Sequence, residues 1–162
     1  MTAWRTILAM SFIQPEAVLG HWQGHRRLTR RLIEAYPDQQ LFAFSLGGMR
    51  PFGLLAQEML AMTVPMVKGI VTGEWHYDED KTPRQKTDLL RLWDEATEQL
   101  NTYWAQIRPE QFAQHMVAFG QYPGAVHDLL LYVIDNEIHH RGQGYVYLRA
   151  LGIEPPPFYE RS

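Results

Sequence analysis

The chain has 162 residues, of which 46% are hydrophobic and 12% aromatic, and its formal net charge is −3. This composition supplies enough apolar side chains for the core of one domain and argues against intrinsic disorder. The absence of cysteine excludes disulfides, thiolate nucleophiles and cysteine-ligated metal sites. A slightly acidic chain lacks the positive field that draws proteins to nucleic acid, and no segment approaches the ~20 apolar residues of a membrane span. We therefore expect one soluble, cytoplasmic domain over residues 1–162, with no nucleic-acid or membrane partner.

The segment from Met1 to Met10 holds a single arginine and a short apolar stretch. This stretch is too brief for the core of a secretory signal with a cleavage site. Met10 is an alternative start, which would leave residues 1–9 as a loosely held extension.

The first predicted helix runs from about Pro15 to Tyr36 and is stopped by Pro37. Large side chains recur along it every three or four residues, so they share one face that must be buried. The basic run 25–31 is interrupted by a leucine and followed by apolar residues. That pattern is typical of the water-facing side of an amphipathic helix, and we expect this run to be solvated.

A second helix is predicted from about Pro51 to Gly73, after a loop rich in phenylalanine and glycine. Pro65 lies within it and is predicted to kink it, because proline removes a backbone donor and clashes with the preceding turn. A charged loop, 74–84, separates it from a third helix predicted over 85–107.

The last third of the chain holds an irregular connection, 110–124, and a fourth helix from about Ala125 to Leu151, with Gly152 as its stop. Three consecutive prolines then prevent helix formation, so the tail is predicted to pack as an extended strap. Because no segment shows the alternation of a strand, the predicted fold is an all-α four-helix bundle with an extended proline-rich C-terminal tail.

Polar and titratable side chains are concentrated in the middle of the fourth helix. Helical spacing directs Asn136 and His140 into the bundle, one turn apart and about 6 Å along the axis, near enough to hold one ion or ligand. Asp135 and Glu137 are nearby carboxylates that would ligate or orient an imidazole. The alternative is that His140 is a core histidine satisfied by a buried hydrogen bond.

The segment Asn136–Gln143, followed by Tyr147–Gly152, resembles the last-helix signature of the DinB-like (DinB/YfiT) family. The order of four long helices agrees with this resemblance. So do Trp22 with His25, Arg26 and Arg27 in the first helix, and the segment Met49–Gly53 that opens the second. The resemblance covers most of the chain, and its sharpest motif is in the last helix.

This resemblance implies a four-helix bundle, often a homodimer, with a divalent metal held by three histidines, one from the second helix and two from the last. The last of these positions is His140 here, but its partner four residues earlier is Asn136, and the second-helix position, six residues after Phe52, is Glu58. A carboxylate, an amide oxygen and an imidazole form a harder site that suits Mn²⁺ or Fe²⁺, or weakly held Zn²⁺ or Ni²⁺. The alternative is a metal-free centre in which Glu58 accepts a hydrogen bond from His140 or Asn136.

Two classes of function follow. The resemblance implies a metal-dependent hydrolase or thiol S-transferase, with Glu58 or Glu137 as the catalytic base. The alternative is a non-enzymatic, stress-associated protein, either a dimeric scaffold or a small-ligand carrier. The predicted ligand pocket is formed by Trp22, His25, Met59 and Tyr147 around His140.

Overall fold

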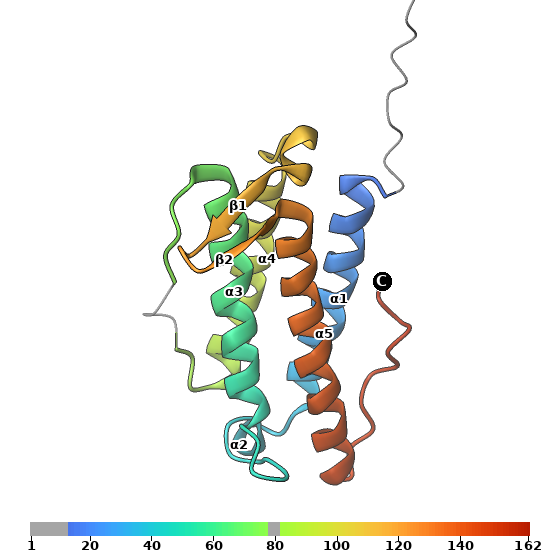
Figure 1. Ribbon diagram of the computed structural model, residues 1–162. Coiled ribbons are helices and arrows are strands. Elements are labelled where there is room, and N and C mark those ends of the chain that lie inside the picture. Colours follow the sequence, from blue (N-terminus) through green and yellow to red (C-terminus); the bar gives the residue numbers. More distant parts are fainter. Residues whose placement is uncertain (1–12, 78–81) are drawn as a thin grey trace, which may run out of the picture.

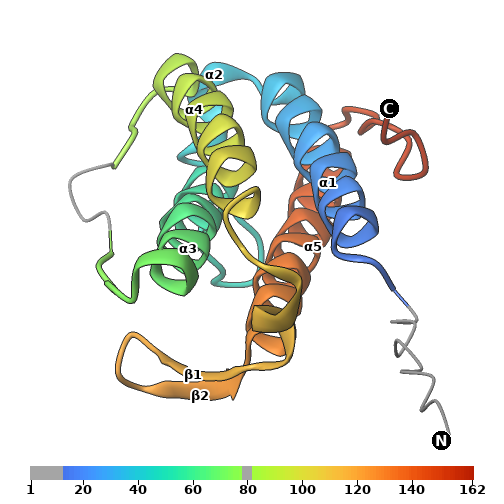
Figure 2. The same cartoon turned by 90° about the horizontal axis from the view of Figure 1, so that it is seen from above.

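A computed structural model describes residues 13–77 and 82–162, so the predicted extension over residues 1–9 lies outside the described residues. Four long helices form a bundle (Figure 1): α1 (Pro15–Ala35), α3 (Phe52–Thr72), α4 (Lys86–Trp104) and α5 (Val126–Ala150). In the view from above, α1 and α3 occupy opposite corners, and each packs against both α4 and α5 (Figure 2). The predicted all-α four-helix bundle is confirmed.

Local chemistry sets the ends of these helices. Pro15 occupies the first turn of α1, and the helix gives way to extended backbone at Tyr36, directly before Pro37. The short helix α2 (Asp38–Leu41) follows. Gly73 and Gly152 adopt left-handed backbone angles directly after α3 and at the end of the turn that closes α5, which glycine does without steric cost. Pro65 lies inside α3 without ending it.

The connection before α5 is more regular than predicted. It contains a 3₁₀ helix, η1 (Pro109–Ala113), and an antiparallel hairpin of β1 (His115–Ala118) and β2 (Tyr122–Ala125). Left-handed backbone at Phe119 and Gly120 supplies the twist that a tight hairpin requires. The prediction that this segment is irregular was wrong, because two strands of four residues are too short to show a clear alternation.

The core consists of two packed clusters, one toward each end of the bundle. One gathers around Phe52, Met59 and Tyr147, and the other around Trp22 and Leu130. Among the described residues, α3 is a helix long and apolar enough to cross a membrane by length and composition alone. In its most apolar window 61% is buried inside the bundle, which is the pattern of a core helix in a soluble domain.

The expectation that the basic run of α1 is solvated was wrong for His25, which is 2% exposed, and for Arg26, which is only 1% exposed. Its guanidinium stacks 4.1 Å from the centre of the Trp93 ring and donates to the Thr97 hydroxyl (2.8 Å), the Thr63 hydroxyl (3.1 Å) and the Trp93 carbonyl (3.0 Å). Amphipathic patterns treat every charged residue as exposed, but a guanidinium with a hydrogen bond at each of its three nitrogens and a carboxylate nearby is tolerated in a core.

The C-terminal tail forms the predicted strap and lies along α1 and α5 (Figure 1). Arg27 donates from Nε to the Arg161 carbonyl at 2.8 Å, and Arg31 donates to the Glu160 carbonyl. These contacts fix the end of the tail across the bundle surface.

The close approach of α3 and α5 makes Gly144 a test of the packing. A Cβ there would lie 2.6 Å from Cε2 of Phe52, whereas a Cβ at Gly142 would meet nothing within 4 Å. We expect Gly144→Ala to lower the free energy of unfolding by about 1–3 kcal/mol through overpacking. The matched Gly142→Ala should raise it by up to about 1 kcal/mol through helix propensity. Urea denaturation measures both, and equal effects of the two substitutions would contradict this packing.

Candidate functional site

The three residues that the family resemblance implied as metal ligands lie together. Glu58 on α3 faces Asn136 and His140 on α5. One carboxylate oxygen, Oε1, accepts from Asn136 Nδ2 at 3.1 Å and lies 3.0 Å from His140 Nε2. This arrangement joins the two helices through a single oxygen.

The second carboxylate oxygen of Glu58 is paired with Arg50, whose Nη2 lies 2.5 Å from Oε2. Partial burial alone raises the pKa of Glu58, but hydrogen bonds from Arg50, Asn136 and His140 outweigh it and hold the pKa at about 2. Tyr147 positions Arg50 by donating its hydroxyl to the Arg50 carbonyl at 3.2 Å. Glu58 is therefore ionised at any physiological pH.

His140 is buried, and both of its ring nitrogens face oxygen atoms. Nδ1 lies 2.8 Å from Oε1 of Gln143, opposite the contact with Glu58. The ring is thus held between the Gln143 amide and Glu58, with Nε2 directed at the carboxylate. A hydrogen-bond partner on the second ring nitrogen, which orients the imidazole, is a common feature of metal-binding histidines.

Asn136 contributes an unsatisfied acceptor. Its Oδ1 is buried and has no hydrogen-bond partner in the described parts of the chain. A buried polar atom without a partner is costly and requires an explanation. The described residues contain no group of three or more histidine, aspartate, glutamate or cysteine side chains arranged for a metal, so any ion bound here would need this amide oxygen as its third donor.

Glu137, the other candidate base, faces away from this group. It is 1% exposed and accepts from Trp22 Nε1 (3.2 Å) and from the Thr29 hydroxyl (2.7 Å), with Arg26 Nη1 at 3.8 Å. Helical geometry explains the separation, because adjacent residues of a helix differ in direction by about 100°. Its carboxylate holds α5 against α1.

His25 belongs to a second buried network on the α1 side of α5. Arg141 donates from Nη2 to His25 Nδ1 at 2.9 Å, Arg161 Nη1 lies 3.4 Å from His25 Nε2, and His21 Nε2 lies 3.1 Å from the same atom. Burial, reinforced by the charges of Arg141 and Arg161 and by His21, lowers the pKa of His25 to about 3. The imidazole is therefore neutral.

The four residues predicted to line a ligand pocket are dispersed. Trp22 belongs to one core cluster, Met59 and Tyr147 belong to the other, and His25 is bonded to Arg141. A cavity of about 510 Å³ lies instead between α5 and the C-terminal tail. Sequence reasoning also missed the roles of Arg50, which pairs with Glu58, and of Arg141, which donates to His25.

Comparison with known proteins agrees with this arrangement of helices. The model of the DinB family matches residues 10–162, nearly the whole chain. The chain belongs to the DinB family. The uncharacterized protein YjoA of Bacillus subtilis (strain 168) is 25% identical over 151 residues, which cover 91% of this chain and 97% of YjoA.

Two solved structures share the DinB-like fold. The crystal structure of the DinB-like protein YjoA from Bacillus subtilis superposes with a TM-score of 0.71 at 22% identity, covering 90% of this chain and 99% of that one. A DinB-like protein from Bacillus cereus ATCC 10987 gives a TM-score of 0.74 at 18% identity, covering 89% and 97%. At these identities the likeness establishes the fold of the bundle.

The buried carboxylate of Glu137 provides a test of the network between α1 and α5. Glu137→Gln keeps the shape but removes the charge that compensates Arg26, so we expect a loss of roughly 3 kcal/mol in the free energy of unfolding. The exposed Glu98→Gln should change it by less than about 0.5 kcal/mol. Urea denaturation of both variants measures this difference, and a stable Glu137→Gln protein would show that the charge is dispensable.

The lowered pKa of His25 predicts a pH dependence of stability. Between its ordinary pKa of 6.5 and the folded value of about 3, the unfolded chain binds a proton that the folded protein excludes. Stability should therefore fall as the pH falls through this window, by up to about 1.4 kcal/mol per pH unit from this group. Denaturation midpoints across this range should flatten in His25→Asn and retain the wild-type slope in the exposed variant His115→Asn.

Proposed function

We propose that this DinB-family protein binds a divalent transition-metal ion at Glu58, Asn136 and His140. The observation that carries the proposal is the unsatisfied, buried Oδ1 of Asn136, which lies in the same group as an ionised carboxylate and a histidine nitrogen. These donors are two oxygens and one nitrogen, a set that suits Mn²⁺, Fe²⁺ or a weakly held Zn²⁺ or Ni²⁺.

The surrounding residues support this assignment. The amide of Gln143 holds His140 with Nε2 toward Glu58, and the low pKa of Glu58 keeps its carboxylate ionised and ready to ligate. Arg50 neutralises the same carboxylate when no ion is bound. Arg50 binds Oε2, whereas Asn136 and His140 lie at Oε1, so its positive charge beside the proposed ion is expected to weaken metal binding by like-charge repulsion.

A bound ion would supply a Lewis acid that activates water or a thiol, the chemistry of a hydrolase or a thiol S-transferase. This chain would supply the ligands and the positive charge of Arg50 for an anionic substrate group. Glu58 serves as a ligand in this arrangement. The hydrogen bonds of Glu137 to Trp22 and Thr29 favour a positioning role for that residue over a catalytic one.

One observation favours a second candidate. The 2.5 Å contact between Arg50 and Glu58 completes the charge balance of the centre without an ion, so a metal-free protein with a ligand-carrying or scaffold role is the alternative. Exposed apolar side chains on α5, including Leu131, Tyr132 and Val146, support the homodimer that the family resemblance implies. A cytoplasmic location remains part of the proposal.

Elemental analysis of protein purified without chelator tests the metal proposal. We expect near-stoichiometric Mn, Fe, Ni or Zn per chain in the wild type, because the Glu58 carboxylate, the Asn136 amide and a His140 ring nitrogen lie in one group. The metal should be lost in His140→Ala and retained in His139→Ala, whose exposed imidazole is the adjacent one. Arg50→Gln should bind the ion more tightly, because it removes the neighbouring positive charge.

The metal-free alternative makes the opposite prediction. No metal in the wild type or in Arg50→Gln, after incubation with each ion in turn, would overturn the metal proposal. Binding that persists unchanged in His140→Ala would place the ion elsewhere and overturn it equally.

A further inference from the structure

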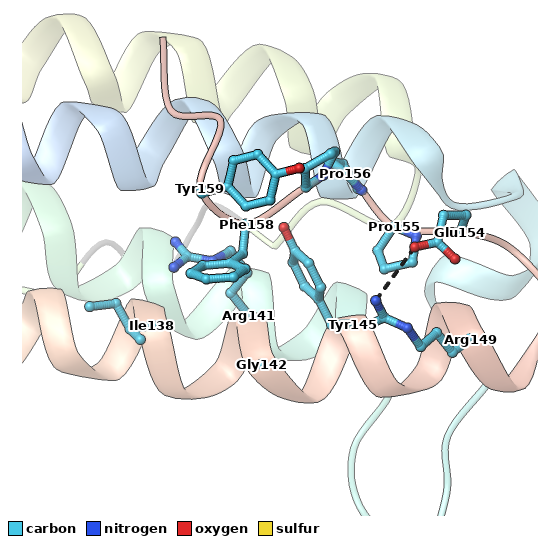
Figure 3. Close-up of a pocket in the computed structure, with 11 residues that line it drawn as sticks. Ile138, Arg141, Gly142, Tyr145, Arg149, Glu154, Pro155, Pro156, Phe158 and Tyr159 are labelled. Carbon is cyan, nitrogen blue, oxygen red and sulfur yellow. Dashed lines mark ion pairs between the residues drawn. The ribbon is translucent and has the colours of Figure 1, made fainter.

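A second candidate site lies under the C-terminal tail, on the face of α5 that points away from Glu58. A cavity of about 510 Å³ is bounded by Arg141, Tyr145 and Arg149 on α5 and by residues 154–159 of the tail (Figure 3). This volume is within the usual range of about 300–1,000 Å³ for small-molecule pockets. It is large enough for a small organic ligand.

The cavity lies in a positive field. Tyr145 lies near four arginines, whose charges oppose the effect of burial on its pKa; burial is the stronger influence and raises that pKa. Glu154 is the acid among the lining residues, and it pairs with Arg149 at 3.6 Å while its own side chain is 86% exposed. The lining therefore carries two positive charges against one solvated negative charge.

Two buried polar atoms beside the tail lack partners. Tyr145 Oη and Arg31 Nε form no hydrogen bond with any described residue. In Figure 3 the Tyr145 hydroxyl points toward the tail, between Phe158 and Pro155. Arg141, beside them, directs its two terminal nitrogens at His25 and Thr29. Unsatisfied donors around a positive cavity indicate an absent acceptor.

The opposite wall is apolar and held in place. Phe158 and three consecutive prolines cover the cavity from the tail side, and proline fixes its own backbone angle. Contacts of Arg27 and Arg31 with the end of the tail anchor this wall to α1. Because this wall is already held in place, little conformational entropy of the tail would be lost when a ligand binds, which favours affinity.

We propose that this pocket binds a small carboxylate with an aromatic or apolar body. The carboxylate accepts hydrogen bonds from the Tyr145 hydroxyl and the arginine side of the pocket, and the apolar body packs against Phe158 and the prolines. The arrangement matches the usual anatomy of a ligand site, in which a few polar groups orient a ligand held by apolar walls. The proposal is independent of the metal centre, which uses another face of α5.

Isothermal titration with 1-naphthoate, and with the neutral 1-naphthamide as the matched probe, tests the proposal. We expect one naphthoate per chain, bound at least about tenfold more tightly than the amide. Tyr145→Phe and Arg149→Gln should each weaken naphthoate binding severalfold, whereas Glu154→Gln should strengthen it by freeing Arg149. The controls Tyr132→Phe and Arg91→Gln, which alter exposed residues away from the pocket, should leave it unchanged.

Further readouts separate the outcomes. Tyr145→Phe removes a buried hydroxyl that has no partner, so its melting temperature without ligand should equal or exceed that of the wild type. His140→Ala should bind naphthoate as the wild type does; loss of binding there would place the probe at the metal centre and overturn the proposal. Equal affinity for the two probes, no saturable binding, or indifference to Tyr145→Phe and Arg149→Gln would overturn it as well.

Discussion

The ion pair between Arg26 and Glu137 is the interaction on which the bundle depends. Arg26 belongs to α1, and its guanidinium contacts Thr63 of α3, Thr97 of α4 and the carboxylate of Glu137 on α5. One side chain therefore links α1 to the three other long helices. Leaving one member of a buried pair without its partner costs about 3–5 kcal/mol. Relative sliding or rotation of any helix would break part of this network, which therefore specifies how the helices are aligned.

This ion pair fixes the orientation of α5 about its own axis. As a result, three faces of that helix have different surroundings. Once Glu137 points at α1, helical geometry directs Asn136 and His140 to α3 and exposes the side of Tyr145 to the tail. The polar run in the middle of the helix is thus a set of separate groups. Each group contacts a different neighbour, and Asn136 Oδ1 and Tyr145 Oη are the buried polar atoms of this helix that lack a partner among the described residues.

The sequence predicted the parts of the fold that depend on local chemistry. Proline at the start of α1 and glycine at the ends of α3 and α5 mark boundaries because their backbone preferences act within a few residues. The position of Arg26 was mispredicted because its burial depends on acceptors from three other helices. The family resemblance pointed to Glu58, Asn136 and His140 as one group, and the structure brings these three side chains together. The pocket under the tail has no local signal in the sequence, because it depends on contacts between segments distant in sequence.

The central carboxylate of Glu58 links the chemistry of the centre to the packing of α3 against α5. In the structure Glu58 is held by Arg50 on one oxygen and by Asn136 and His140 on the other, so the charge is compensated from the loop that precedes α3. An ion bound at Oε1, as proposed, would weaken the hold of Glu58 on Arg50, whose carbonyl accepts a hydrogen bond from Tyr147 on α5. The same guanidinium would then be available to an anionic group at the edge of the centre. In the proposed metal-bound state, the ion and Arg50 would be coupled through Glu58, because two positive charges beside one carboxylate repel each other.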